Sequence, residues 1–239
     1  MTIENNTRII IALDYSDQRQ VNALVEQLDP KRVKLKVGKE LFTRFGPDLV
    51  KQLVAQGFDV FLDLKFHDIP NTVAKACQAA ADLGVWMINV HASGGRRMLQ
   101  AAQESLVDSG QQKPLLVAVT ILTSLAEDEL GEIGFQGTAA EHVNQLALLA
   151  QDCGLDGVVC SAQEALALRR LCQAGFRLVT PGIELTDNVT SDQKRTTSVQ
   201  QAINNGADYL VIGRAVTTSS QPLEKIKRIE LDIAQCIVE

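Results

Sequence analysis

The sequence predicts an α/β protein that folds as a single (β/α)8 barrel, the TIM-barrel fold, over residues 1–239. Short β-rich runs alternate with longer segments of helical apolar spacing, which implies parallel strands joined by helical crossovers. The chain has 239 residues, and such a barrel typically needs ~250. No linker or low-complexity tract separates a second domain. An open doubly wound sheet would alternate in the same way, but the G-x-G-x-x-G and Walker A motifs are both missing, which favours the closed barrel.

Eight runs rich in aliphatic and β-branched residues are the predicted strands. They recur along the whole chain, so one strand and one helix follow each other eight times. In order, the predicted strands are Arg8–Tyr15, Val33–Gly38, Asp59–Phe66, Trp86–His91, Leu115–Leu122, Gly157–Cys160, Leu178–Thr180 and Tyr209–Ile212.

The segments between these strands carry apolar residues at helical spacing. Two examples are Leu41, Phe45, Leu49 and Leu53 after the second strand, and Leu166, Leu168, Leu171 and Cys172 after the sixth. The stretch Glu184–Thr197 after the seventh strand is polar and poor in apolar anchors, so we expect a mobile loop there. Loops on that side of a barrel cover the active site.

The composition excludes several classes of protein. Lys and Arg number 23 against 29 Asp and Glu, a net charge of −6, which argues against a nucleic-acid partner. The three histidines are scattered and the five cysteines form no C-x-x-C pair, so we expect no metal site and reduced thiols in a cytoplasmic protein. We expect no signal peptide, because the N-terminus is polar, and no membrane association, because no run of ~18 apolar residues occurs.

Charged residues are predicted to gather at the upper mouth of the barrel. Side chains alternate between the two faces of a strand, so Asp63 and Lys65 share the inward face of the third strand. Lys34 and Lys36 point inward from the second strand, and Asp14 ends the inward row of the first. The plainer interpretation is a structural salt-bridge network. Buried charges rarely stabilise more than apolar replacements do, and barrels carry their chemistry at this face, so the pattern favours a functional site.

The ten residues from Asp63 to Thr72, DLKFHDIPNT, resemble the Asp-x-Lys-x-x-Asp-Ile-Pro signature of the orotidine 5′-phosphate decarboxylase family. This resemblance implies a (β/α)8 barrel that converts orotidine 5′-phosphate (OMP) to UMP and CO₂ without metal or cofactor. It extends in order along the chain through Ala12–Asp14, Lys36–Gly38, Thr120–Ser124, Thr180–Ile183 and Val211–Arg214.

The resemblance also implies a role for each residue of the charged row. Lys65 is expected to donate the proton to C6 of the pyrimidine, and Asp63 to lie beside the substrate carboxylate. Lys36 is expected to bind within the row and to the ribose, and Asp14 to bind ribose hydroxyls.

Further residues are implied to complete the site. Asp68 and Thr72 are expected to reach the neighbouring subunit's site in an obligate homodimer, and the pyrimidine is expected to contact Thr123 and Ser124. The substrate-binding residues expected after the seventh and eighth strands, where barrels often hold phosphate, are Pro181, Gln193, Gly213 and Arg214.

One position departs from the family pattern. Where many bacterial members carry Arg, this chain has Glu184, which would repel a phosphate dianion if it faced one. The phosphate is then expected to depend on Arg214, Gln193 and backbone N–H groups, with Lys194 or Arg195 as a substitute cation.

Three alternatives stay open. A sugar-phosphate lyase similar to hexulose-phosphate synthase shares Asp-x-Lys-x-x-Asp but uses a metal and lacks the Ile-Pro-Asn-Thr continuation. A Schiff-base aldolase could use Lys65, although the carboxylates of Asp63 and Asp68 would favour the protonated, non-nucleophilic amine. An inactive sensor of a phosphate ligand could share the fold. Structural roles are expected for His67, His91 and His142.

Overall fold

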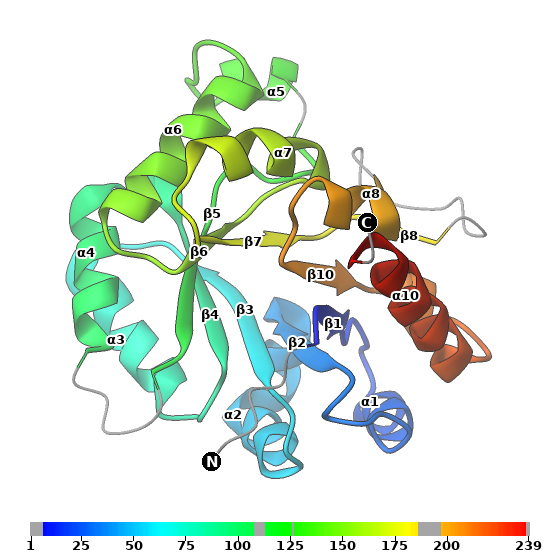
Figure 1. The fold of residues 1–239 in the computed structure, drawn as a ribbon. Coiled ribbons are helices and arrows are strands. Elements are labelled where there is room, and N and C mark those ends of the chain that lie inside the picture. Colours follow the sequence, from blue (N-terminus) through cyan, green and yellow to red (C-terminus); the bar gives the residue numbers. More distant parts are fainter. Residues whose placement is uncertain (1–6, 108–112, 126, 186–196, 238–239) are drawn as a thin grey trace.

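A closed barrel of eight parallel strands forms the centre of the computed structural model, which describes residues 7–107, 113–125, 127–185 and 197–237 (Figure 1). Neighbouring strands follow chain order, and β1 closes the barrel against β10. The predicted fold is confirmed. The barrel strands are β1 Ile9–Ala12, β2 Lys34–Gly38, β3 Val60–Phe66, β4 Met87–His91, β5 Leu115–Val119, β6 Gly157–Val159, β7 Arg177–Thr180 and β10 Tyr209–Ile212.

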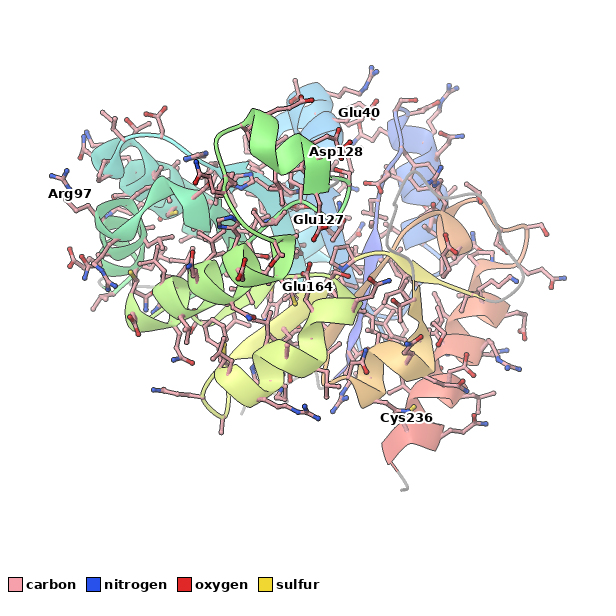
Figure 2. All side chains as sticks on the ribbon, turned by 90° about the horizontal axis from the view of Figure 1, so that it is seen from above. Glu40, Arg97, Glu127, Asp128, Glu164 and Cys236 are labelled. Atoms are coloured by element: carbon pink, nitrogen blue, oxygen red, sulfur yellow. The ribbon has the colours of Figure 1, made fainter. Side chains whose placement is uncertain are left out.

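Helices surround the barrel and present charged side chains to solvent, such as the exposed Arg97 and Asp128 in Figure 2. Side-chain caps start several of them: Thr138 and Ser161 each form a capping box with the Glu three residues later. The helices are α1 Gln18–Val25, α2 Lys39–Ala55, α3 Pro70–Ala81, the 3₁₀ turn η1 Ala92–Gly94, α4 Arg96–Ser105, α5 Glu127–Glu132, α6 Ala139–Asp152, α7 Ala162–Leu171, α8 Val199–Asn204, α9 Arg214–Thr217 and α10 Pro222–Ile237. None of the helices in these described ranges has the length and apolar character needed to cross a membrane.

The predicted apolar face of α7 is partly wrong. Leu168 and Cys172 are buried, whereas Leu166 and Leu171 are 42% and 41% exposed. Residues three or four apart share a helix face, so Leu166, two positions before Leu168, lies on the opposite side. The buried stripe runs instead through small residues, Ala162 and Ala165.

The barrel interior is filled by a second apolar cluster, separate from the core between barrel and helices. Its members alternate along their strands with residues that face the helices, as predicted. Below this cluster, Trp86 and Tyr209 meet edge to face, with ring centroids 5.0 Å apart. The inner cluster consists of Ile10, Ala12, Phe61, Met87, Val117, Val179 and Val211.

A small parallel sheet lies beyond the end of β7. It pairs β8 (Ile183–Glu184) with β9 (Thr197–Ser198), and the Thr197 N–H donates to the Gly182 carbonyl at 3.1 Å. The prediction of one loop over Glu184–Thr197 is therefore wrong at both ends, because a two-residue strand carries no alternation that a sequence pattern can reveal. Gln193, Lys194 and Arg195 lie outside the described residues.

Candidate active site

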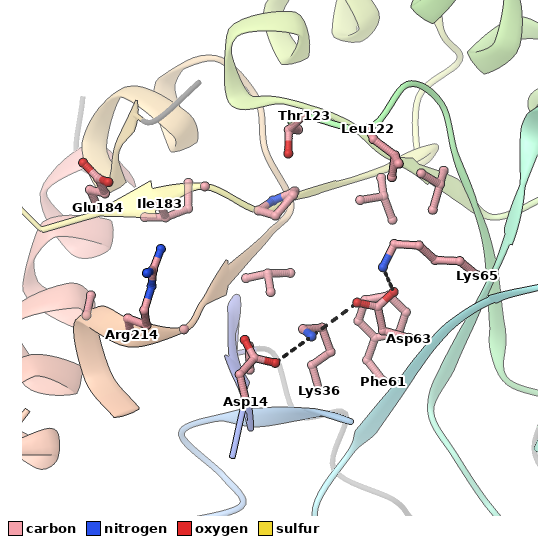
Figure 3. Close-up of a pocket in the computed structure, with 18 of the residues that line it drawn as sticks. Asp14, Lys36, Phe61, Asp63, Lys65, Leu122, Thr123, Ile183, Glu184 and Arg214 are labelled. Atoms are coloured by element: carbon pink, nitrogen blue, oxygen red, sulfur yellow. Dashed lines mark hydrogen bonds and ion pairs between the residues drawn. The ribbon is translucent and has the colours of Figure 1, made fainter. Parts of the chain in front are cut away.

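A cavity of about 710 Å³ opens at the carboxyl ends of the barrel strands, where the charged residues were predicted to gather (Figure 3). Its apolar lining includes Phe61 and Val211 from the inner cluster, with Ile121 and Leu122 after β5. The predicted site residues that line it are Asp14, Lys36, Asp63, Lys65, Thr123, Pro181, Gly213 and Arg214. Ser124 is exposed and is not part of this lining.

Four charged side chains form an alternating row across one wall of the cavity (Figure 3). The Lys36 Nζ lies 3.4 Å from Asp14 Oδ1 and 3.3 Å from Asp63 Oδ2, and the Lys65 Nζ lies 2.6 Å from Asp63 Oδ1. Because β1, β2 and β3 are neighbours, with Ala12 beside Lys36 and Gly38 beside Asp63, residues distant in sequence meet at one height. The predicted charged row is confirmed as an arrangement of side chains.

The backbone at Lys65 is unusual. Its φ is 53°, in the left-handed region that non-glycine residues rarely adopt, and the pairing of β3 with β4 shifts register between Leu62 and Phe66. Such a conformation costs about 1–3 kcal/mol and persists where the surrounding structure holds it. Alternation along the strand predicted the shared face of Asp63 and Lys65 but not this bulge.

The environment of Asp63 keeps its carboxylate charged. Burial by itself would raise the pKa of Asp63, but the charges of Lys36 and Lys65, together with hydrogen bonds from Lys65 and Asn89, bring that pKa below its ordinary value. Only 12% of the Asp63 side chain is exposed, against 25% for Lys65. The row therefore presents an ammonium group to the cavity, held against a buried carboxylate.

The family of the chain follows from comparison with known proteins. The model of the "Orotidine 5'-phosphate decarboxylase / HUMPS family" matches residues 7–229, most of the 239 residues of the chain. The chain belongs to this family.

Named relatives of the orotidine 5′-phosphate decarboxylase family agree over nearly the whole length. The proteins named orotidine 5′-phosphate decarboxylase from Psychromonas ingrahamii and Nitrosococcus oceani are 57% and 56% identical to this chain, covering 93% and 95% of it and 95% and 98% of themselves. A crystal structure of orotidine 5′-phosphate decarboxylase from Lactobacillus acidophilus superposes with a TM-score of 0.85 at 38% identity, covering 95% of this chain and 99% of that one. The predicted family is confirmed.

The wall opposite Lys65 carries Glu184, the residue expected to depart from the family pattern. Figure 3 shows Arg214 and Glu184 across the cavity from Lys65, and both belong to its lining. Arg214 begins α9 directly after Gly213, and Glu184 lies in β8. The small β8–β9 sheet therefore brings a carboxylate to the end of the cavity where phosphate was expected.

Asp68 and Thr72 do not join the cavity of their own chain. Both are exposed, and the Asp68 carboxylate accepts a 2.6 Å hydrogen bond from the Ile69 N–H at the entrance to α3. Ile69 has extended backbone angles and Pro70 starts the helix, as the residues around a proline predict. Ile69 is 66% exposed, which is high for a large apolar residue.

The histidines take different surroundings. Burial, followed by the charges of His67, Lys39 and Lys65, lowers the pKa of His91 to about 4, so its ring is neutral near pH 7. His67 packs beside it, with ring centroids 5.5 Å apart, and His142 hydrogen-bonds the Gln136 carbonyl at 2.8 Å. Within the described part of the chain, no three His, Cys, Asp or Glu side chains group so that they could hold a metal ion.

Sequence reasoning missed Asn89, which stands directly behind the charged row. It is 1% exposed, and its Nδ2 donates a 2.7 Å hydrogen bond to Asp63 Oδ1. Its inward position on β4, two residues after Met87, follows from strand alternation. An asparagine in a strand does not by itself indicate what it binds, so the signal was too weak to assign a role.

Proposed function

We propose that this chain decarboxylates OMP to UMP and CO₂, the last step of de novo pyrimidine nucleotide synthesis. The family membership and the names of the relatives support this activity. The observation that carries it is the alternating row of Asp14, Lys36, Asp63 and Lys65 along the cavity wall, which ends in the Lys65 ammonium.

Lys65 is the proton donor in this proposal. Loss of CO₂ leaves a carbanion at C6 that the pyrimidine ring delocalises poorly. A preorganised ammonium stabilises that developing charge and then delivers a proton to C6. The 2.6 Å contact with Asp63 holds the Lys65 Nζ at the cavity wall.

Asp63 lies beside the departing carboxylate in this proposal, and its charge would disfavour the bound substrate relative to the transition state. Two charges ~4 Å apart interact by ~4 kcal/mol at an effective dielectric of ~20. Enzymes typically lower the activation free energy by ~8–23 kcal/mol, so this one contact cannot account for the whole rate enhancement. Binding energy from the rest of the substrate must contribute, and the phosphate is its natural source.

The phosphate is bound in this proposal by Arg214, with Gly213 and Gln193, and the ribose by Asp14 and Lys36. Guanidinium groups bind phosphate oxygens strongly because both partners are charged. Glu184 lowers the positive charge at that end, so Arg214 carries more of the binding than it would beside a second arginine. Thr123 contacts the pyrimidine in this proposal, and Pro181 is a further substrate-binding residue of the cavity lining.

The reaction is proposed to need no metal or cofactor. The test is the loss of OMP absorbance on adding purified protein, with and without EDTA. Full activity in EDTA is expected. Activity that returns only with an added divalent cation would indicate a metal-dependent sugar-phosphate lyase instead, and no turnover of OMP at all would refute the proposed activity.

We also propose an obligate homodimer in which each site uses Asp68 and Thr72 of the other subunit. Three features support it: Asp68 and Thr72 are exposed, neither lines the cavity of its own chain, and the exposed apolar Ile69 lies between them in sequence. A two-fold interface would make the exchange reciprocal.

The shared site can be tested by complementation. Lys65→Ala and Asp68→Ala subunits are each expected to be inactive as homodimers. After subunit exchange, a heterodimer contains one site with both defects and one with neither, so activity should return. No recovery despite demonstrated exchange would refute the shared site.

A further inference from the structure

Asn89 forms hydrogen bonds with both residues of β3 that are proposed to act in catalysis, Asp63 and Lys65. Its Oδ1 accepts a 2.8 Å hydrogen bond from the Lys65 backbone N–H, and its Nδ2 donates a 2.7 Å hydrogen bond to Asp63 Oδ1. The same Asp63 oxygen accepts from Lys65 Nζ at 2.6 Å. The three residues therefore form a closed ring of hydrogen bonds in which Asn89 contacts the Lys65 backbone and the Asp63 carboxylate at once.

The ring coincides with the bulge in β3. Lys65 has a φ of 53°, and the pairing of β3 with β4 is interrupted between Leu62 and Phe66. Asn89 accepts the Lys65 N–H inside this interruption, which removes the cost of a buried donor without a partner. Because backbone direction determines where a side chain leaves the strand, the amide oxygen of Asn89 stabilises the conformation from which Lys65 reaches the cavity.

Asn89 itself is firmly placed and does not line the cavity. It is 1% exposed, and its strand neighbour on the other side is Val117 of β5. Of the charged groups, Asp63 and Lys65 on β3 hydrogen-bond Asn89 directly. Lys36 on β2 pairs with the other Asp63 oxygen, and His91 lies two residues further along β4. A rigid group with no access to substrate acts on the reaction only through the residues that it holds.

We propose that Asn89 is a positioning residue for decarboxylation, which orients the Lys65 backbone and the Asp63 carboxylate together. This inference rests on the proposed function. An amide suits the position because it offers one acceptor and one donor in a fixed plane. Aspartate would accept from Lys65 N–H but face Asp63 with a second carboxylate, and leucine of similar volume would bind neither group.

The positioning role of Asn89 is tested with two variants, Asn89→Leu and Asn89→Asp. Asn89→Leu removes both hydrogen bonds, and kcat for OMP should fall by about 10–100-fold, since small misplacements of reacting groups have effects of that size. The KM should stay within about threefold, because Asn89 does not touch the substrate. Thr180→Val is the control: Thr180 on β7 is equally buried, but its hydroxyl donates to the Tyr209 carbonyl at 3.1 Å and touches neither Asp63 nor Lys65, and its kinetic constants should match the wild type.

Asn89→Asp gives a readout that general damage to the fold would not produce. At alkaline pH its kcat should fall like that of Asn89→Leu, because two carboxylates face each other. As the pH is lowered, one carboxyl of the pair gains a proton and can donate to the other, so the ratio of variant to wild-type kcat should rise. The same ratio for Asn89→Leu and Thr180→Val should stay flat across the pH range.

The outcomes are distinct. Circular dichroism and melting curves on each variant establish folding, and if Asn89→Leu does not fold, the pH profile of Asn89→Asp decides. An active wild type with Asn89 variants of unchanged kcat, a loss confined to KM, or a flat ratio for Asn89→Asp would overturn the positioning role alone. A wild type without activity on OMP would overturn the proposed function and this role together.

Discussion

The two ends of the barrel use the same residue type differently. Lys34 and Lys36 are two positions apart on β2 and point into the same barrel. At the floor, Lys34 is 1% exposed, pairs with Asp59 at 2.5 Å and lies 4.4 Å from the ring centroid of Trp86. At the mouth, Lys36 lies between the carboxylates of Asp14 and Asp63 and lines the cavity.

This difference between Lys34 and Lys36 shows that a buried charged side chain can reach a substrate only where it faces an open cavity. At the floor, aromatic rings close the barrel, so the Lys34 ammonium is enclosed by an ion pair and a cation–π contact and can only stabilise the fold. At the mouth, opposite charges balance in a row, but one side of the row faces an open space of about 710 Å³. The sequence pattern around the two lysines is alike. Their roles differ because the side chains at the floor enclose the Lys34 ammonium group, whereas the Lys36 ammonium group faces the cavity.

The largest effect is expected at the mouth, for Lys65→Ala. The variant should lose decarboxylation by at least ~10²-fold, the usual contribution of an acid–base group, because Lys65 is the only basic side chain of the Asp63–Thr72 signature that lines the cavity. Its circular dichroism and melting temperature should remain close to wild type. Turnover above ~1% of wild type by a folded variant would contradict Lys65 as the donor.

Arg214→Ala tests the cavity wall opposite the charged row, where the phosphate is proposed to bind. The expected loss in kcat/KM for OMP is about 10–100-fold, the value of one hydrogen bond to a charged group. The phosphate-free nucleoside should lose much less, because it has nothing for the guanidinium to bind. Equal losses on both substrates would remove Arg214 from the phosphate site.

Lys34→Met tests the ion pair at the floor of the barrel, and Lys36→Met is the matching substitution at the mouth. Removing the Lys34 ammonium leaves Asp59 without its 2.5 Å ion pair, and the free energy of unfolding should fall by about 1–3 kcal/mol. Asp59 is 34% exposed and can be hydrated, which keeps the loss moderate. The kcat should stay within about threefold of wild type, whereas Lys36→Met should reduce it far more. Equal kinetic losses from the two variants would contradict the separation of floor and mouth.

The smallest expected effect concerns acid stability. Burial lowers the pKa of His91 to about 4 in the folded chain, against 6.5 ordinarily. Between these values the unfolded chain binds a proton that the folded chain does not, so stability falls as the pH drops from ~6.5 to ~4. Because the ring is partly exposed, solvent screening keeps this loss to about 1 kcal/mol. His91→Gln should show a shallower loss in urea unfolding over this window.

The acid-stability test has an internal reference in Asp63. Its folded pKa lies below the ordinary 3.8, so its contribution is present above that value and is lost only as the pH falls further. A loss of stability in His91→Gln that matches wild type between pH ~6.5 and ~4 would show that His91 does not titrate as its burial implies.

The sequence by itself determined the order of the eight strands and the charged row. Both follow from patterns of short range: strand and helix alternate in hydrophobicity, and side chains two residues apart on a strand share a face. These rules place Asp63 with Lys65, and Lys34 with Lys36. The signature from Asp63 to Thr72 then indicated the family, which the comparisons confirmed.

The tertiary structure decided the features that depend on distant partners. Lys65 adopts a φ of 53° beside Asn89, 24 residues away, and the Asn89–Asp63 hydrogen bond spans 26 residues. The pairing of β8 with β9 likewise joins segments on either side of residues 186–196, and Leu166 is exposed because the barrel lies on the other side of α7. A lysine with a positive φ is unfavourable by itself, so this conformation persists only where folding brings a hydrogen-bond acceptor to its N–H. The local sequence around Lys65 does not indicate which residue provides that acceptor.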